Sequence, residues 1–287
     1  MIQPITYQFV QGCFPKRDSA AHKYKNGFVT TFVGSFQYPG AARLCCHAAA
    51  QAGAGGVYAL LPESLWPLIG SIPAEVIPYM IKEHDGVLSI VDSVENFLVI
   101  KEKSSAILLG PGIGRHASLS NLLKSMLSMT ELPCVIDGDG LSILGQLGEN
   151  FLIQHSHGRW LLTPHQGEWQ QLLKSFEYNP ALSPQELAAK WGCTILLKGF
   201  PSHIYTVDGQ IYVNTTGNPA ATTAGCGDVL AGLIAGYLAQ GLSPDQSACV
   251  GIYLAGQAAD RLVATTRRHS VMATEILAEL ATNQLTK

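Results

Sequence analysis

The sequence predicts an α/β fold in which a mostly parallel β-sheet lies between two layers of helices. Short apolar runs alternate with longer segments of helical periodicity along the chain. The apolar runs are nearly continuous, as in Ala106–Gly110, which is typical of strands buried on both faces. Glycine-rich or polar loops follow these runs. They are expected at the carboxyl edge of the sheet, where ligands bind in such folds.

Each predicted strand is a short run of β-branched or apolar residues that is bounded by turn residues. The predicted strands are, in chain order, Phe28–Gly34, Val57–Leu61, Ala106–Gly110, Cys134–Asp137, Trp160–Thr163, Thr194–Lys198, His203–Val207 and Ile211–Val213. The last two are expected to form an antiparallel hairpin, because Asp208-Gly209 suits a tight turn.

The predicted helices lie between these strands and make up most of the last third of the chain. They are Gly40–Ala52, Ser118–Met129, Gly140–Leu147, Gly167–Phe176, Pro184–Trp191, Asp228–Gln240, Pro244–Thr265 and Val271–Thr282. The alanine-rich segment at 40–52 suits either a helix interface or the core.

Composition limits the class of protein. Apolar residues make up 47% of the 287 positions and charged residues 14%, which predicts a large core and little disorder. We expect a single domain over residues 1–287, because no linker or repeat divides them. The net charge is −3 and no basic cluster exceeds Arg267-Arg268, which argues against a nucleic-acid partner.

The sequence also predicts a cytoplasmic protein. The seven cysteines are odd in number and show no CxxC spacing, which indicates reduced thiols. No run of 18 apolar residues could cross a membrane, so no membrane partner is expected. The first residues lack the pattern of a signal peptide.

The stretch NTTGNPAATTAGCGDVL at 214–230 carries the strongest functional signal. Small residues let a backbone approach a ligand closely, and the helix that follows begins with unpaired N–H groups. Gly225 and Gly227 thus predict an anion-binding helix start, and Asp228 would stand beside it as a general base. The alternative is that Asp228 only caps its helix, as an N-cap or N1 residue.

Other loops at the same predicted edge carry candidate residues that each have a structural alternative. GPGIG at 110–114 is either a tight turn or a close approach to a ligand. Asp137 and Asp139 are either turn residues or ligands of a substrate hydroxyl or hydrated Mg²⁺. His165 and Glu168 in TPHQGE either start a helix or face the ligand. Lys198 in KGFPS is either a surface lysine or a contact for a nucleotide.

The motifs GPGIG, DGDGLS, TPHQGEW, LLKGF and GNPAATTAGCGDVLAGLIAG, in this order, resemble those of the ADP/ATP-dependent NAD(P)H-hydrate dehydratases. The resemblance covers about residues 22–282 and implies a ribokinase-like three-layer α/β/α sandwich. It also implies a lyase that repairs hydrated NADH or NADPH: a nucleotide phosphorylates the hydrate, and loss of phosphate regenerates the reduced dinucleotide. Only the dehydratase-type domain is expected, because the chain has no room for the epimerase domain fused to it in many bacteria.

The resemblance also implies roles for individual residues. Asp228 would be the base, with Gly225 and Gly227 shaping the anion hole. The hydrated dinucleotide would be contacted by Ala41, Gly114, His165 and Asp228, and ATP or ADP by Lys198, Gly199, Phe200, Pro201, Ser202 and Gly227. Glu168 would help to hold Mg²⁺, through water. The family tends to self-associate, so a homo-oligomer, such as a tetramer, is expected.

The sequence departs from the usual family pattern at several positions. They are Pro39, Ser142, Ala220-Ala221, Ala224, Cys226 and Ala255. Two alternatives are therefore kept. One is a small-molecule kinase of the same superfamily, of the hydroxymethylpyrimidine or hydroxyethylthiazole type. The other is a nucleotide-binding protein that has lost catalysis.

Overall fold

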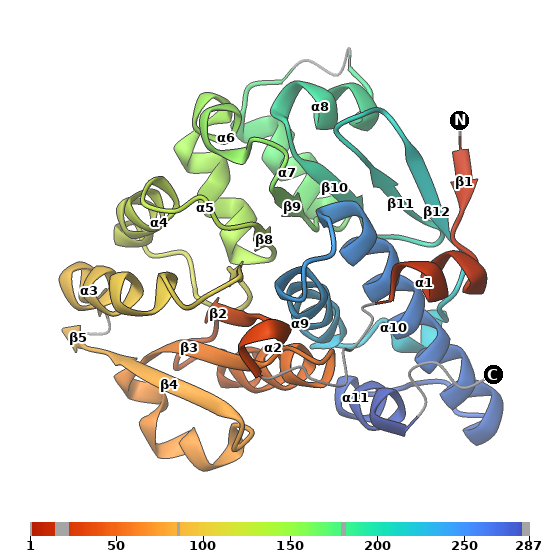
Figure 1. Ribbon diagram of the computed structural model, residues 1–287, viewed down its shortest axis with the longest axis horizontal. Helices are drawn as coiled ribbons and strands as arrows, with labels where there is room; N and C mark the ends of the chain where they lie inside the picture. Colours follow the sequence, from red (N-terminus) through yellow and green to blue (C-terminus); the bar gives the residue numbers. More distant parts are fainter. Residues whose placement is uncertain (1, 15–22, 85–86, 179–181, 283–287) are drawn as a thin grey trace.

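The computed structural model describes residues 2–14, 23–84, 87–178 and 182–282. Residue 22, where the expected core begins, lies outside these ranges. In them the chain forms a ten-stranded sheet, drawn in Figure 1, with the order β1-β12-β11-β10-β9-β8-β7-β2-β3-β4. Only β11 runs against its neighbours, so the sheet is mostly parallel, as predicted.

The strands of this sheet are β1 (Ile2–Pro4), β2 (Phe28–Phe32), β3 (Gly56–Pro62), β4 (Val76–Ile81), β7 (Ala106–Leu109), β8 (Cys134–Ile136), β9 (Trp160–Leu162), β10 (Thr194–Leu197), β11 (Ser202–Tyr205) and β12 (Ile211–Asn214). A separate hairpin consists of β5 (Glu83–His84) and β6 (Val87–Leu88). The predicted hairpin of β11 and β12 is confirmed, with Tyr205 opposite Ile211.

The helices are α1 (Tyr7–Cys13), α2 (Pro39–Gln51), α3 (Ile90–Lys101), α4 (Ser118–Ser128), α5 (Asp139–Leu147), α6 (Glu149–Ser156), α7 (Gln166–Ser175), α8 (Pro184–Trp191), α9 (Cys226–Ala239), α10 (Pro244–Thr266) and α11 (Ala273–Thr282). Short 3₁₀ segments are η1 (Lys23–Asn26), η2 (Glu63–Ser71) and η3 (Pro219–Ala221).

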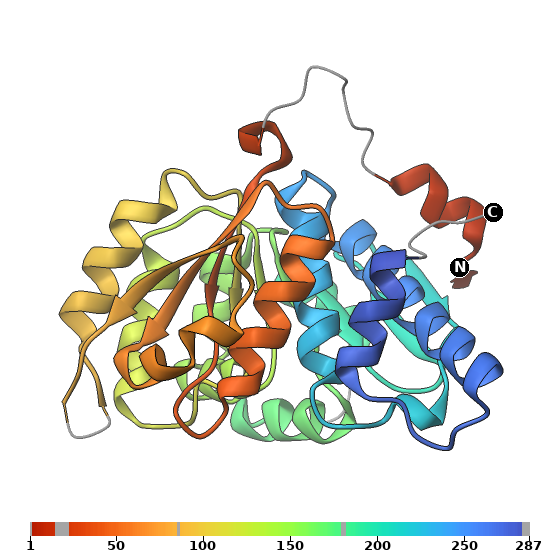
Figure 2. The same ribbon diagram turned by 90° about the horizontal axis from the view of Figure 1, so that it is seen from below.

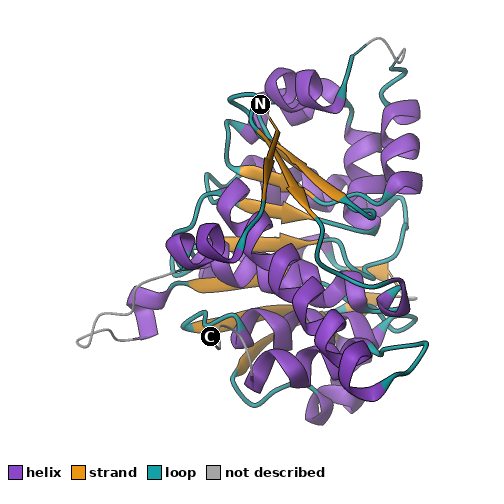
Figure 3. Cartoon of the chain, turned by 90° about the vertical axis from the view of Figure 1, so that its right-hand side faces the viewer, coloured by secondary structure: helices purple, strands orange, loops and turns teal. Residues whose placement is uncertain are grey.

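The strands lie between two helical layers, as Figure 3 shows, and each layer covers its own hydrophobic core. Residues of β7 alternate between the cores: Ala106 and Leu108 face α1, α2, α9, α10 and α11, whereas Ile107 and Leu109 face α3 to α8. This period of two follows from the pleat of a strand. The predicted three-layer sandwich is therefore confirmed.

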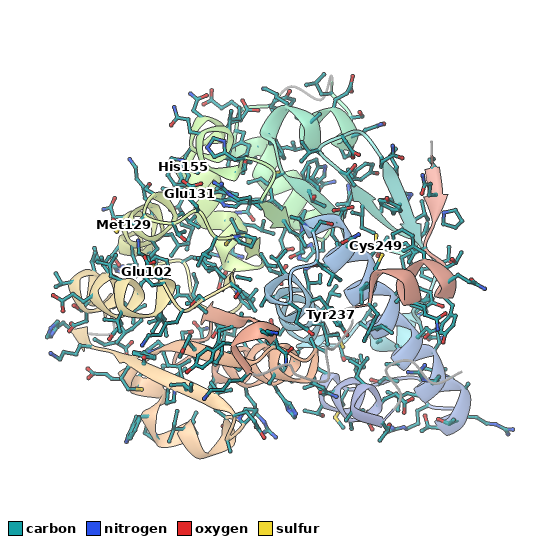
Figure 4. The ribbon with its side chains drawn as sticks, viewed as in Figure 1. Glu102, Met129, Glu131, His155, Tyr237 and Cys249 are labelled. Atoms are coloured by element: carbon teal, nitrogen blue, oxygen red, sulfur yellow. The ribbon has the colours of Figure 1, made fainter. Side chains whose placement is uncertain are left out.

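Helix α9 packs directly on α2, and Figure 2 shows both beside α11 on one face of the sheet. A Cβ at Gly232 would lie 2.3 Å from the carbonyl oxygen of Cys45, and one at Gly236 would lie 2.6 Å from that of Ala49. The glycines thus permit backbone contact between the helices. Tyr237, labelled in Figure 4, is fully buried in this layer. The alanine-rich segment is therefore part of the core.

Several elements were not predicted. Strand β4 contains Pro78, and proline argues against a strand unless the strand lies at an edge, as β4 does. The remaining ones are β1, β5, β6, α1, α3 and α6. Helix α6 follows α5 across the single residue Gly148, which has a positive φ of 90°. The prediction also started α9 at Asp228, whereas the helix begins two residues earlier, at Cys226.

No helix in the described ranges is long and apolar enough to cross a membrane.

Candidate active site

A hollow of about 510 Å³ lies at the carboxyl edge of the sheet, and we call it the central hollow. It lies among the loops that follow β2, β7, β8 and β9 and the start of α9. Its lining brings together four of the predicted site residues, from three separate segments of the sequence: Ala41, Glu168, Gly225 and Asp228. The position fits the general rule that open parallel sheets bind ligands at this edge.

The start of α9 forms one wall of the central hollow. Gly225 precedes the helix with a φ of 90°, and a Cβ there would lie 2.5 Å from Leu44 Cδ1. Gly227 and Asp228 are in the first turn, so their N–H groups lack partners in the helix. Neither donates to another group in the described part of the chain. The helix start therefore offers donors for an anion.

Asp228 is the third residue of α9, so its interpretation as an N-cap or N1 residue was wrong. Its carboxylate has no hydrogen-bond partner among the described residues. The pKa of Asp228 is raised to about 6, mainly by burial. The Asp137 carboxylate also contributes to this rise, and its effect is larger than the opposite effect of Lys198. An acid with this pKa is charged at neutral pH but takes up a proton readily, as a general base must.

Lys198 lies inside the protein and contacts carboxylates, so it is not a surface lysine. Its Nζ is 2.7 Å from Asp137 Oδ1 and 3.9 Å from Glu168 Oε2, and its side chain is 18% exposed. Burial alone would lower the pKa of Lys198, but Asp137, Glu168 and Asp228 together raise it. Thr163 also donates to Asp137, at 2.8 Å. The ammonium group is thus held charged beside Asp228.

The lysine also faces the start of α9. A Cβ added to Gly227 would lie 3.7 Å from Lys198 Nζ, and no other atom of the described residues outside its own helix lies within 4 Å. The space between the first turn of α9 and the ammonium group therefore has N–H donors on one side and a cation on the other. Such a space suits the oxygens of a phosphoryl group.

His165 and Glu168 form a capping box at the start of α7. His165 Nδ1 accepts hydrogen bonds from the N–H groups of Gly167 at 3.0 Å and Glu168 at 3.2 Å. Glu168 Oε2 accepts from the His165 N–H at 2.8 Å. Because Nδ1 accepts, a neutral ring carries its proton on Nε2. The ring is 60% exposed and can donate to a ligand from Nε2.

The segment from Lys198 to Ser202 forms the turn between β10 and β11. Ser202 Oγ donates to the Gly199 carbonyl at 2.7 Å and accepts from its N–H at 3.2 Å. The Phe200-Pro201 peptide bond is cis, and the Phe200 side chain is 67% exposed. Within this turn only Lys198 reaches the carboxylates around Asp228.

Two residues outside the set of assigned sites connect the loops. Asp139 Oδ2 accepts from the Gly114 N–H at 3.0 Å, and its Oδ1 is 2.7 Å from Arg115 Nε. Asp139 thereby fixes the GPGIG loop against the start of α5. Arg115 was not among the predicted site residues. The only signal was a lone cation directly after the glycines in a chain with few charges.

The departures from the family pattern lie at positions where the replacement residues fit the structure. Pro39 opens α2, where a proline is favourable, and it lines the central hollow together with Ala224. Cys226 is the first residue of α9, with Sγ 3.2 Å from Thr223 Oγ1. Ser142 lies within α5 and Ala255 within α10. None of these replacements places a bulky side chain at the start of α9.

The charge of Asp228 should cost stability. In the folded protein its pKa is about 6, above the 3.8 of an ordinary aspartate, so folding favours the protonated form. Stability therefore falls as the pH rises through this interval. We expect Asp228→Asn to raise the free energy of unfolding by about 1–3 kcal/mol near pH 8 and little near pH 4. Urea unfolding at both pH values measures this.

The control for this measurement is Asp245→Asn, which removes an acid from the first turn of α10. Such an acid is stabilising near a helix N-terminus, so this variant should lose a few tenths of a kcal/mol. A loss of stability in Asp228→Asn near pH 8 would mean that Asp228 only supports its helix.

The fold and the site define a class of enzyme, the ribokinase-like proteins. The chain superposes on a ribokinase-like superfamily protein from Enterococcus faecalis with a TM-score of 0.85 and 28% identity, covering 99% of this chain and 95% of that one. Residues 29–282 match the family model of the NAD(P)H-hydrate dehydratases, and the chain belongs to this family.

Two further relatives agree with this assignment. The ADP/ATP-dependent NAD(P)H-hydrate dehydratase from Bacillus subtilis, co-crystallised with ATP and Mg²⁺, superposes with a TM-score of 0.77 and 26% identity over 97% of this chain and 96% of that chain. The bifunctional NAD(P)H-hydrate repair enzyme from Moorella thermoacetica is 33% identical over 95% of this chain and 52% of its own length. The chain spans about half the length of such bifunctional relatives.

Proposed function

We propose that this chain is a lyase that dehydrates the S form of hydrated NADH or NADPH at the expense of ATP or ADP. The products are the reduced dinucleotide, ADP or AMP, and phosphate. Family membership favours this reaction over the kinase alternatives. The observation that carries the proposal is a half-buried acid, Asp228, with a pKa of about 6 at a helix start that can bind an anion.

The first step is transfer of the terminal phosphoryl group to the hydroxyl of the hydrate. Asp228 accepts the hydroxyl proton as the oxygen attacks phosphorus, and the bond from phosphorus to the departing ADP or AMP breaks. The N–H groups of Gly227 and Asp228 and the Lys198 ammonium group would bind the charge that develops on the phosphoryl oxygens.

The second step is elimination. The bond between the ring carbon and the phosphate oxygen breaks, a proton leaves the neighbouring carbon, and the ring double bond of the reduced nicotinamide is restored. The hydroxyl oxygen of the hydrate ends in the released phosphate. Lys198 and the start of α9 would stabilise the leaving phosphate as they stabilise the transferred group.

Mg²⁺ is the expected companion of the nucleotide. No group of three or more acidic, histidine or cysteine side chains is arranged as metal ligands in the described ranges. Mg²⁺ keeps several waters and often binds through one or two carboxylates and substrate phosphates, so Glu168 fits as a ligand through water. The ion would neutralise phosphate charge.

The remaining assignments belong to the same proposal. Ala41, Gly114 and His165 would contact the hydrated dinucleotide, and the turn from Lys198 to Ser202 the adenine nucleotide. We further propose a single catalytic domain that acts in the cytoplasm as a homo-oligomer. The seven cysteines are all free thiols, which supports a reducing compartment.

The direct test mixes the purified chain with hydrated NADH or NADPH, ATP or ADP, and Mg²⁺. We expect release of phosphate together with recovery of the absorbance of the reduced nicotinamide, and neither without a nucleotide. Phosphorylation of hydroxymethylpyrimidine or hydroxyethylthiazole instead would contradict the proposal. Binding of a nucleotide without turnover would indicate the impaired homologue.

A further inference from the structure

A second hollow, of about 650 Å³, adjoins the central one, and we call it the side hollow. Gln37 and Arg115 line both hollows. The side hollow extends away from Asp228 to η2 and the start of β5. If the proposed function holds, the nicotinamide end of the dinucleotide occupies the central hollow at Asp228. The other half of the same molecule then needs a neighbouring space.

The side hollow contains groups that suit an adenosine. The Phe36 side chain is 78% exposed at its wall and offers an aromatic face on which a base can stack. Ser35 and Ser64 also line it, and their hydroxyl oxygens are buried without a hydrogen-bond partner among the described residues. Buried hydroxyls without partners are rare. Rotation about χ1 would let each hydroxyl form a hydrogen bond with a ligand.

The far wall of the side hollow is acidic. Glu83 Oε2 accepts from the Ser64 N–H at 2.9 Å, and Glu63 Oε1 accepts from the Glu83 N–H at 3.0 Å. These bonds hold both carboxylates in place and leave one oxygen of each without a partner within the described residues. Carboxylates bind the 2′- and 3′-hydroxyls of a ribose and repel a phosphate at the 2′ position.

The basic side chains nearby do not offset this charge. Arg115 lies at the boundary of the two hollows, where its Nε binds Asp139, so it is placed for the pyrophosphate in the middle of a dinucleotide. Lys82 is next to Glu83 in sequence, but its Nζ is 3.6 Å from Asp92 Oδ1. The His116 ring is hydrogen-bonded to Ser118, with Nδ1 2.8 Å from Oγ.

We infer that the side hollow binds the adenosine half of the hydrated dinucleotide, and that Glu63 and Glu83 make the chain prefer hydrated NADH over hydrated NADPH. The two substrates differ only in the 2′-phosphate. This inference rests on the proposed function for the identity of the ligand, whereas the preference follows from the two carboxylates.

The test compares kcat/KM for both hydrates in the wild-type chain, in the double variant Glu63→Gln/Glu83→Gln, and in the control Glu95→Gln. Glutamine keeps an acceptor oxygen for each backbone N–H but removes the charge. Glu95 is an exposed acid on α3 that does not line either hollow. We expect the wild type to favour hydrated NADH by about tenfold or more and the double variant to favour it by less than about threefold. The control should match the wild type.

A second measurement separates this inference from the proposed function. The affinities of NADH and NADPH themselves, followed by their fluorescence, should show the same preference and the same loss in the double variant. Equal affinities, a preference for NADPH, or a preference unchanged by the double substitution would overturn the inference. Failure to turn over either hydrate, with the NADH preference intact, would contradict the proposed reaction and leave the binding inference supported.

Discussion

Asp228→Asn is expected to lower the turnover of the hydrated dinucleotide by about 10²–10⁴-fold, the contribution of a general base. Asparagine has nearly the same shape, so the start of α9 and its N–H donors should keep their positions. The affinity for ATP should therefore not fall, because an amide has no charge to repel phosphate. Steady-state kinetics and isothermal titration of the nucleotide measure the two effects separately.

The pH profile of the wild type gives an independent measure of the same residue. The base must be deprotonated, and its pKa is about 6 because of burial and the neighbouring Asp137 carboxylate. The rate at saturating nucleotide should therefore rise as the pH increases through about 6 and level off above it. The matched variant Asp245→Asn, at the start of α10, should keep the wild-type rate and profile. Near-normal turnover of Asp228→Asn would remove Asp228 from the mechanism.

The sheet and the edge that carries the hollows could be predicted because both depend on local patterns. Near-continuous apolar runs marked the central strands, and glycine-rich loops marked their carboxyl ends. Parallel strands bring such loops together, so Ala41, Glu168, Gly225 and Asp228 meet at one hollow. Their roles stay predictions. Strand β4 was not predicted because it contains Pro78, and proline has a low propensity for strands except at the edge of a sheet.

Pairings between distant side chains could not be predicted. The ion pair of Lys198 with Asp137 joins residues on the neighbours of β9, so it depends on the order of β8, β9 and β10. Sequence alone left Lys198 as either a surface lysine or a nucleotide contact. The bond of Asp139 with Arg115 likewise depends on how the loops after β7 and β8 meet. The raised pKa of Asp228 comes from this same assembly.

Gly227→Val is expected to weaken the binding of ATP or ADP by about 10²-fold, because close approach of phosphate to the start of α9 would be blocked. The added side chain would project into the space between that first turn and Lys198, where its Cβ would lie 3.7 Å from Nζ. The fold should tolerate it: Gly227 is not among the glycines with positive φ, and valine is a better helix former than glycine. Nucleotide titration and urea unfolding measure both properties.

The neighbouring variant Gly225→Ala serves as the comparison, because it should lose stability, whereas Gly227→Val should lose affinity for the nucleotide. Gly225 has a φ of 90°, and a Cβ there would lie 2.5 Å from Leu44 Cδ1, so alanine should lower the free energy of unfolding by about 1–3 kcal/mol. Gly225 would then be required by the backbone conformation, and Gly227 by the close approach of the ligand. If Gly227→Val folds normally and binds the nucleotide with unchanged affinity, phosphate does not lie against this helix start. Asp228 would then lack the neighbouring anion site that phosphoryl transfer requires.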